Sequence, residues 1–152
     1  MKKVFKKIFF IGLAIFILIQ FYQPARNVSN GQVSALVFTK VYTVPIDVQS
    51  IFKTSCYDCH SNNTSYPCYA YIQPARWFME QHIKDGKSNL NFDEWGIYSA
   101  RKQENKLNRI VKQIKADEMP LASYTMIHKN AKLSDYQKEA IVNWINTVSK
   151  TE

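Results

Sequence analysis

The chain has 152 residues, of which 46% are hydrophobic, and this composition is ordinary for one globular domain with its own core. Its formal net charge of +8 is concentrated at the N-terminus, because removing the lysines at positions 2, 3, 6 and 7 from the 20 basic residues leaves 16 against 12 acidic ones. No arginine-rich stripe or nucleic-acid motif accompanies the remaining charge, so we expect no nucleic-acid partner.

An uncharged and mostly apolar run from Ile8 to Ala25 follows these lysines. A transmembrane helix needs about 17 to 25 such residues, whereas a secretory signal has a shorter apolar core and a small-residue cleavage site. Bulky Phe21 and Tyr22 stand where that cleavage site is expected. We therefore predict that residues 1–23 are an uncleaved single-pass anchor rather than a removed signal. The positive-inside rule then places the following domain on the periplasmic side of a bacterial inner membrane, with the membrane as a partner.

The rest of the chain is predicted to be a linker, residues 24–44, followed by an all-α domain, residues 45–150. The linker is rich in Pro, Asn, Ser and Gly, and no convincing strand pattern follows it. A capping box of Ser134 and Gln137, with an apolar stripe behind it, marks the last helix, and Trp144 on that helix is expected in the core. Helices are predicted from Pro45 to Cys56, from Pro74 to Gly86, from Asp93 or Glu94 to Ala116, and from Ser134 to Val148.

The chemistry of the chain is concentrated in Cys56-Tyr57-Asp58-Cys59-His60, which matches the C-x-x-C-H pattern of covalent haem c attachment. Two thiols three positions apart can reach the two vinyl groups of one macrocycle. The adjacent imidazole is then held against the iron, so His60 is the expected proximal ligand. The sequence therefore predicts one covalently bound haem c.

Two other readings of this motif are less consistent with its surroundings. A thioredoxin-like dithiol would need a strand before it and a long helix after it, but a loop rich in Asn, Ser and Pro follows at residues 61–67. A zinc site would need a second Cys/His pair, and only Cys68, His82 and His128 remain, each singly spaced.

From Pro45 to Val148 the chain resembles the bacterial haem-binding domain proteins that are common in Bacteroidetes and related to class I cytochromes c. Cys68 is a departure, because that family typically has Trp there. The resemblance implies an all-α, cytochrome c-like fold, one haem and no assigned catalysis. Beyond C-x-x-C-H it rests on Asn62, Thr64, Tyr66 and Pro67, on Asn91, Phe92 and Trp95, on Glu118, Met119 and Pro120, and on Tyr124, His128, Ala131 and Leu133.

The sixth iron ligand is predicted to be Met119, which follows a helix and is held by Pro120. His128 and His82 are the alternatives, as is an open site. Trp95 and Tyr124 are placed near the haem, with Tyr124 or Arg101 as a partner of a propionate.

These features predict a non-enzymatic function, the transfer of single electrons between membrane complexes and soluble redox partner proteins. No combination of nucleophile, base and orienting group is recognisable in the sequence. The alternative is a haem-based sensor or a peroxidase-like enzyme, which would need an open or displaceable distal position.

Overall fold

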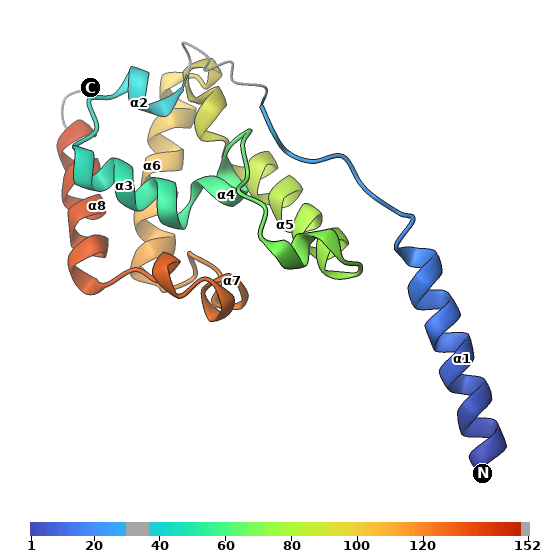
Figure 1. Cartoon of the computed structure of the whole chain (residues 1–152). Helices are drawn as coiled ribbons and strands as arrows, with labels where there is room; N and C mark the ends of the chain where they lie inside the picture. The colour runs from blue at the N-terminus through green and yellow to red at the C-terminus, as the bar shows by residue number, and fades with distance from the viewer. Residues whose placement is uncertain (30–36, 150–152) are drawn as a thin grey trace.

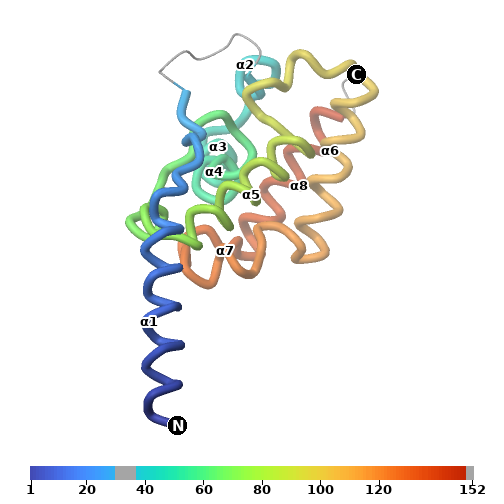
Figure 2. The backbone as a smooth tube through the Cα atoms, turned by 90° about the vertical axis from the view of Figure 1, so that its right-hand side faces the viewer, coloured from blue at the N-terminus to red at the C-terminus, as the bar shows by residue number. Residues whose placement is uncertain are grey.

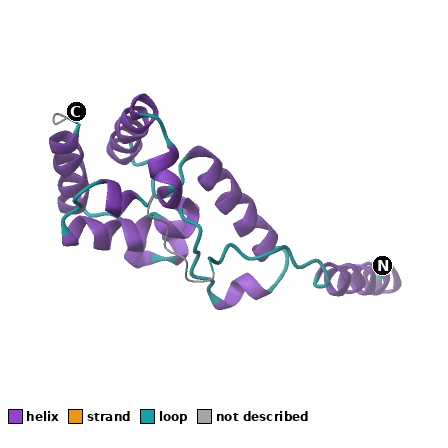
Figure 3. Ribbon diagram, turned by 90° about the horizontal axis from the view of Figure 1, so that it is seen from above, coloured by secondary structure: helices purple, strands orange, loops and turns teal. Residues whose placement is uncertain are grey.

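The computed structural model describes residues 1–29 and 37–149. All regular structure among these residues is helical (Figures 1 and 3), which confirms the all-α prediction. In chain order the helices are α1 (Lys2–Ile19), α2 (Phe38–Val41), α3 (Ile46–Ser55), α4 (Tyr57–His60), η1 (Cys68–Tyr71), α5 (Ala75–Asn89), η2 (Phe92–Ile97), α6 (Ala100–Lys115), α7 (Ala122–Ile127), η3 (Lys129–Ala131) and α8 (Asp135–Val148).

The predicted helix boundaries hold at both ends of the domain and fail in the middle. At α8, the Ser134 side chain accepts a hydrogen bond from the Gln137 N–H, and the Gln137 side chain accepts one from the Ser134 N–H. The predicted capping box is therefore present. The helix predicted from residue 93 is wrong in its first part. Tyr98 and Ser99 are extended, which separates the short η2 from α6.

The core is a cluster of aromatic side chains contributed by α2, α3, η2 and α8. Phe38 is at its centre, with ring centroids 5.5 Å from Phe52, 4.7 Å from Trp95 and 5.4 Å from Trp144. Trp144 also lies 6.0 Å from Phe52, so it joins α8 to α3, as the sequence predicts. Burying one such side chain contributes about 1.5 to 3 kcal/mol, and the cluster therefore fixes the position of α3, whose end carries the motif.

The N-terminal segment differs from the prediction. Helix α1 extends away from the other helices (Figures 1 and 2) and its residues are exposed. It contains all four lysines and ends at Ile19, which leaves uncharged helix only from Ile8 to Ile19, about 18 Å at 1.5 Å per residue. A hydrocarbon core is about 30 Å thick. Within the described ranges no helix is long and apolar enough to cross a membrane, so the predicted transmembrane helix is not found.

The predicted linker, residues 24–44, is not a free tether where it is described. Its residues 30–36 lie outside the described residues, as does residue 150 at the end of the predicted domain. Phe38 is only 1% exposed, because an aromatic ring there completes the core. Asn27 donates from Nδ2 to the Ser61 carbonyl at 2.8 Å and to Thr64 Oγ1 at 2.9 Å. Both ends of the segment are therefore attached to the domain.

Candidate functional site

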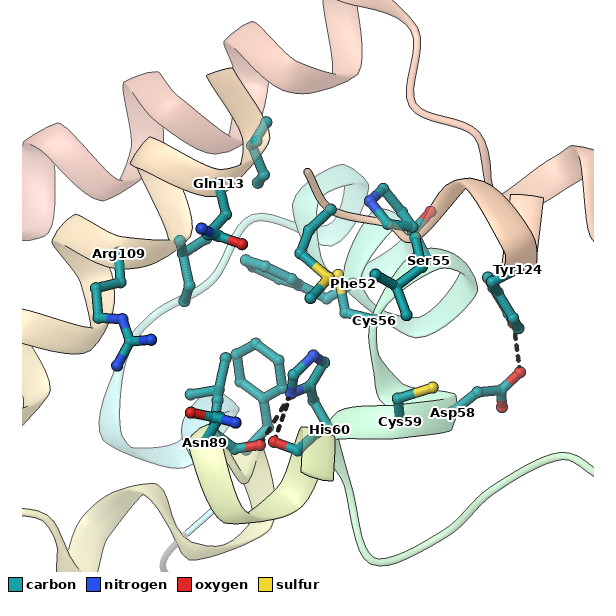
Figure 4. A pocket seen from close by; sticks show the side chains of 18 of the residues that line it. Phe52, Ser55, Cys56, Asp58, Cys59, His60, Asn89, Arg109, Gln113 and Tyr124 are labelled. Carbon is teal, nitrogen blue, oxygen red and sulfur yellow. Dashed lines mark hydrogen bonds between the residues drawn. The ribbon is translucent and has the colours of Figure 1, made fainter. Parts of the chain in front are cut away.

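The motif begins at Cys56, the residue between α3 and the short helix α4, and its other four residues form α4, which contacts α5. The Cys56 N–H donates to the Phe52 carbonyl as the last bond of α3, and the chain then turns into α4. This turn brings Cys56, Cys59 and His60 to one cavity of about 320 Å³ (Figure 4), within the usual size of cofactor sites. Its walls are largely apolar and include Phe52, Leu90, Phe92, Ile110, Ile114, Leu121 and Leu133.

Both thiols of the motif are free and sit in an environment that keeps them protonated. Burial, together with the neighbouring Cys59, raises the pKa of Cys56 to about 12. Burial, with Asp58 nearby, raises the pKa of Cys59 to about 11. A thioredoxin-like dithiol has a lowered pKa instead, so the site lacks the electrostatics of that alternative. Among the described residues no group of three or more His, Cys, Asp and Glu side chains is placed to hold a metal ion.

The imidazole of His60 is oriented by the end of α5. Its Nδ1 lies 3.0 Å from the carbonyl oxygen of Gly86 and 3.0 Å from that of Leu90. Carbonyl oxygens only accept, so Nδ1 carries the proton and Nε2 keeps its lone pair. Burial lowers the pKa of His60 and outweighs the two hydrogen bonds, which raise it, so the ring is neutral. A neutral ring held through Nδ1 is the form in which histidine binds iron through Nε2.

Gly86 makes this arrangement possible, and the sequence reading did not recognise its role. The sequence predicts that this helix ends near Gly86, but α5 continues to Asn89. A Cβ atom at this position would lie 2.5 Å from the carbonyl oxygen of Cys59. Only the absence of a side chain lets α5 lie directly on α4. A glycine inside a helix costs about 1 kcal/mol relative to alanine. Its presence within the predicted helix was the sequence signal that could have indicated a close packing contact.

The candidate sixth ligands fall in two places. Met119 follows α6 and lines the same cavity as His60, and His82 on α5 also reaches this wall. His128 does not line it, because its Nε2 is 2.6 Å from the hydroxyl of Tyr69. Met119 and His82 therefore line the cavity of His60, whereas His128 lines an adjoining pocket. Ligation by Met119 stays a prediction, with His82, His128 and an open site as its alternatives.

Of the two aromatic residues expected near the haem, one lines the cavity and the other does not. Tyr124 lines the cavity, and its hydroxyl donates a hydrogen bond to Asp58 Oδ2 at 2.6 Å. Trp95 does not line the cavity. It is fully buried in the core behind Phe92, with the two rings stacked at 6.2 Å, because η2 turns Phe92 toward the site instead. Arg101 is also absent from the cavity wall.

This donor set suits a haem: two thiols, a neutral imidazole and apolar walls converge on one cavity. Comparison with known proteins agrees. Cytochrome c peroxidase Ccp of Escherichia coli (strain K12) is 29% identical over 93 residues, which cover 59% of this chain and only 20% of that protein. No solved structure matches the chain. The sequence model of the haem-binding domain matches residues 14–147, almost the whole chain, and the protein therefore belongs to the haem-binding domain family.

Proposed function

We propose that this domain holds one haem c covalently and transfers single electrons. The observation that carries the proposal is the convergence of Cys56, Cys59 and His60 on one apolar cavity. Each thiol would add across one vinyl group: a sulfur–carbon bond forms, the thiol hydrogen goes to the neighbouring carbon, and nothing is oxidised. Bound in this way, the iron supplies one-electron chemistry and the chain supplies its ligand, its orientation and a dry environment.

Covalent attachment is tested on protein matured with a cytochrome c assembly system. The wild type should keep its haem through denaturation and acid–acetone extraction, and the Cys56→Ala/Cys59→Ala variant should lose it. Cys68→Ala is the matched control, because Cys68 is exposed and does not line the cavity. Covalent haem in the double variant, or no haem in the wild type, would refute the proposal.

We further propose Met119 as the sixth ligand, which favours electron transfer over ligand binding. A thioether stabilises ferrous iron relative to water, so Met119→Ala should lower the reduction potential and open the iron to CO and cyanide. Met126→Ala is the control, since Met126 is 67% exposed and does not line the cavity. The absorption spectrum of the oxidised protein reports the change. A spectrum that responds to His82→Ala and not to Met119→Ala would assign the other ligand.

A peroxidase-like activity is the second candidate, because the Escherichia coli relative is a cytochrome c peroxidase by name. A haem-based sensor makes the same structural demand, an open or displaceable distal position. Rapid CO binding and peroxide turnover by the wild type would favour these functions. A six-coordinate spectrum that is inert to CO would favour the electron carrier.

We also propose that the domain works on the periplasmic side of a bacterial inner membrane and exchanges electrons with membrane complexes and soluble redox proteins. Attachment of haem c takes place in that compartment, and the basic and apolar N-terminal sequence is typical of exported chains. Protease added to spheroplasts should digest the domain. Full protection in intact spheroplasts would contradict this location.

A further inference from the structure

The cavity has a basic edge that the sequence reading did not identify. Lys106 and Arg109 lie three residues apart on α6, on one face of the helix, and both line the cavity. In Figure 4, Arg109 lies on the opposite side of the site from Cys59, Asp58 and Tyr124. The mostly apolar cavity therefore has Cys59 at one edge and Arg109 at the other, with Cys56 between them in this view.

These cations lack an acidic partner in the described part of the chain. No ion pair involves Lys106 or Arg109, and the Arg109 guanidinium has no hydrogen-bond acceptor there. Lys106 donates one bond, to the Asn89 carbonyl at the end of α5. Burial lowers the pKa of Lys106, and the neighbouring charges of Arg109 and Lys102 lower it further. Asp85 of α5 lines the same cavity but is not paired with either cation, so both remain able to attract an added anion.

The geometry of a haem supplies such an anion. Its two vinyl groups and its two propionates lie at opposite edges of the macrocycle. If Cys56 and Cys59 hold the vinyl edge, the carboxylates would be directed toward the opposite wall, which includes Lys106 and Arg109 of α6. The guanidinium of arginine matches a carboxylate with paired N–H donors, and a lysine ammonium adds a point charge.

We propose that Lys106 and Arg109 form the propionate-binding subsite of this domain. The inference rests on the proposed covalent haem and adds its orientation: the carboxylate edge faces α6, and the vinyl edge faces α4 and α7. Tyr124, which the sequence reading considered as a propionate partner, lies at the vinyl edge with Asp58 as its acceptor.

The subsite has a measurable consequence in the pH dependence of the reduction potential. Two nearby cations keep the propionates ionised to low pH, so the potential of the wild type should change little between pH 5 and 8. Without the cations the pKa of a propionate rises into this range. Protonation then removes negative charge near the iron, which favours the ferrous state, and the potential rises as the pH falls.

The test uses the haem-loaded Lys106→Gln/Arg109→Gln variant and follows its potential by spectroelectrochemistry across this range. Lys112→Gln/Lys115→Gln is the control, because it removes two charges from exposed positions of α6 that do not line the cavity. The other titratable groups on the cavity wall are the same residues in all three proteins. They are Asp58 on α4, His82 and Asp85 on α5, and Tyr124 on α7.

A new pH-dependent slope in the Lys106/Arg109 variant alone supports the subsite. Superimposable profiles in all three proteins, each with its haem attached, overturn it and leave the covalent site intact, whereas a wild type without haem overturns both. If the double variant does not retain haem, Lys106→Arg/Arg109→Lys provides the second test. Haem restored by these charge-conserving changes supports the subsite, and haem still absent refutes it.

Discussion

Replacing Gly86 by alanine should destabilise the protein, although alanine is the better helix former. The new Cβ would lie 2.5 Å from the Cys59 carbonyl oxygen, whereas real Cβ contacts stay beyond 3.0 Å, so α4 and α5 must separate by about 0.5 Å. Such overpacking costs about 1 to 3 kcal/mol. Weakening the buried hydrogen bond from His60 costs about 1 kcal/mol more, and the gain in helix propensity offsets about 1 kcal/mol.

The net loss in the free energy of unfolding is therefore about 1 to 3 kcal/mol, which lowers Tm by roughly 2 to 12 °C for a domain of this size. Thermal unfolding followed by circular dichroism measures it. Gly12→Ala is the matched control: it is also a helical glycine, but its Cβ would meet nothing within 4 Å, and its Tm should not fall. A Tm of Gly86→Ala equal to or above that of the wild type would refute the claimed contact.

Three further outcomes follow from the structure. Phe38→Ala should lower the free energy of unfolding by about 3 to 5 kcal/mol in a denaturant titration, because the ring is 1% exposed in the core; a loss below about 1 kcal/mol would mean that the segment before α3 is a free tether after all. Asn27→Ala should lower the free energy of unfolding by about 1 to 3 kcal/mol, because the Asn27 side chain donates hydrogen bonds to Ser61 and Thr64 in the loop after the motif. Amide exchange in that loop should become faster, and unchanged exchange there would contradict this prediction. In the haem-free protein, iodoacetamide should label exposed Cys68 first, since burial raises the pKa of Cys56 to about 12 and that of Cys59 to about 11 and only the thiolate reacts. The two slow reactions should accelerate as pH rises toward 11, and equal rates for all three thiols at pH 8 would count against the buried site.

Much of the domain was predictable because its signals are local. The capping box at Ser134 and the stripe that contains Trp144 specify α8 from neighbouring residues alone. The C-x-x-C-H motif likewise needs only five consecutive residues. The N-terminal run shows the limit of this reading. Its composition indicates an apolar segment, but where the helix ends, at Ile19, depends on how the following residues attach to the domain.

By itself, then, the sequence determined the helical class, the position of the motif and the identity of the thiols and imidazole, because spacing along one chain is enough to specify each of them. Only the tertiary structure decided which distant residues meet that motif. It placed Phe92 instead of Trp95 at the cavity, kept His128 away from it, and brought Arg109 to its far edge. These outcomes depend on how α5 and α6 pack around α4, and packing joins residues whose separation along the chain carries no periodic signal.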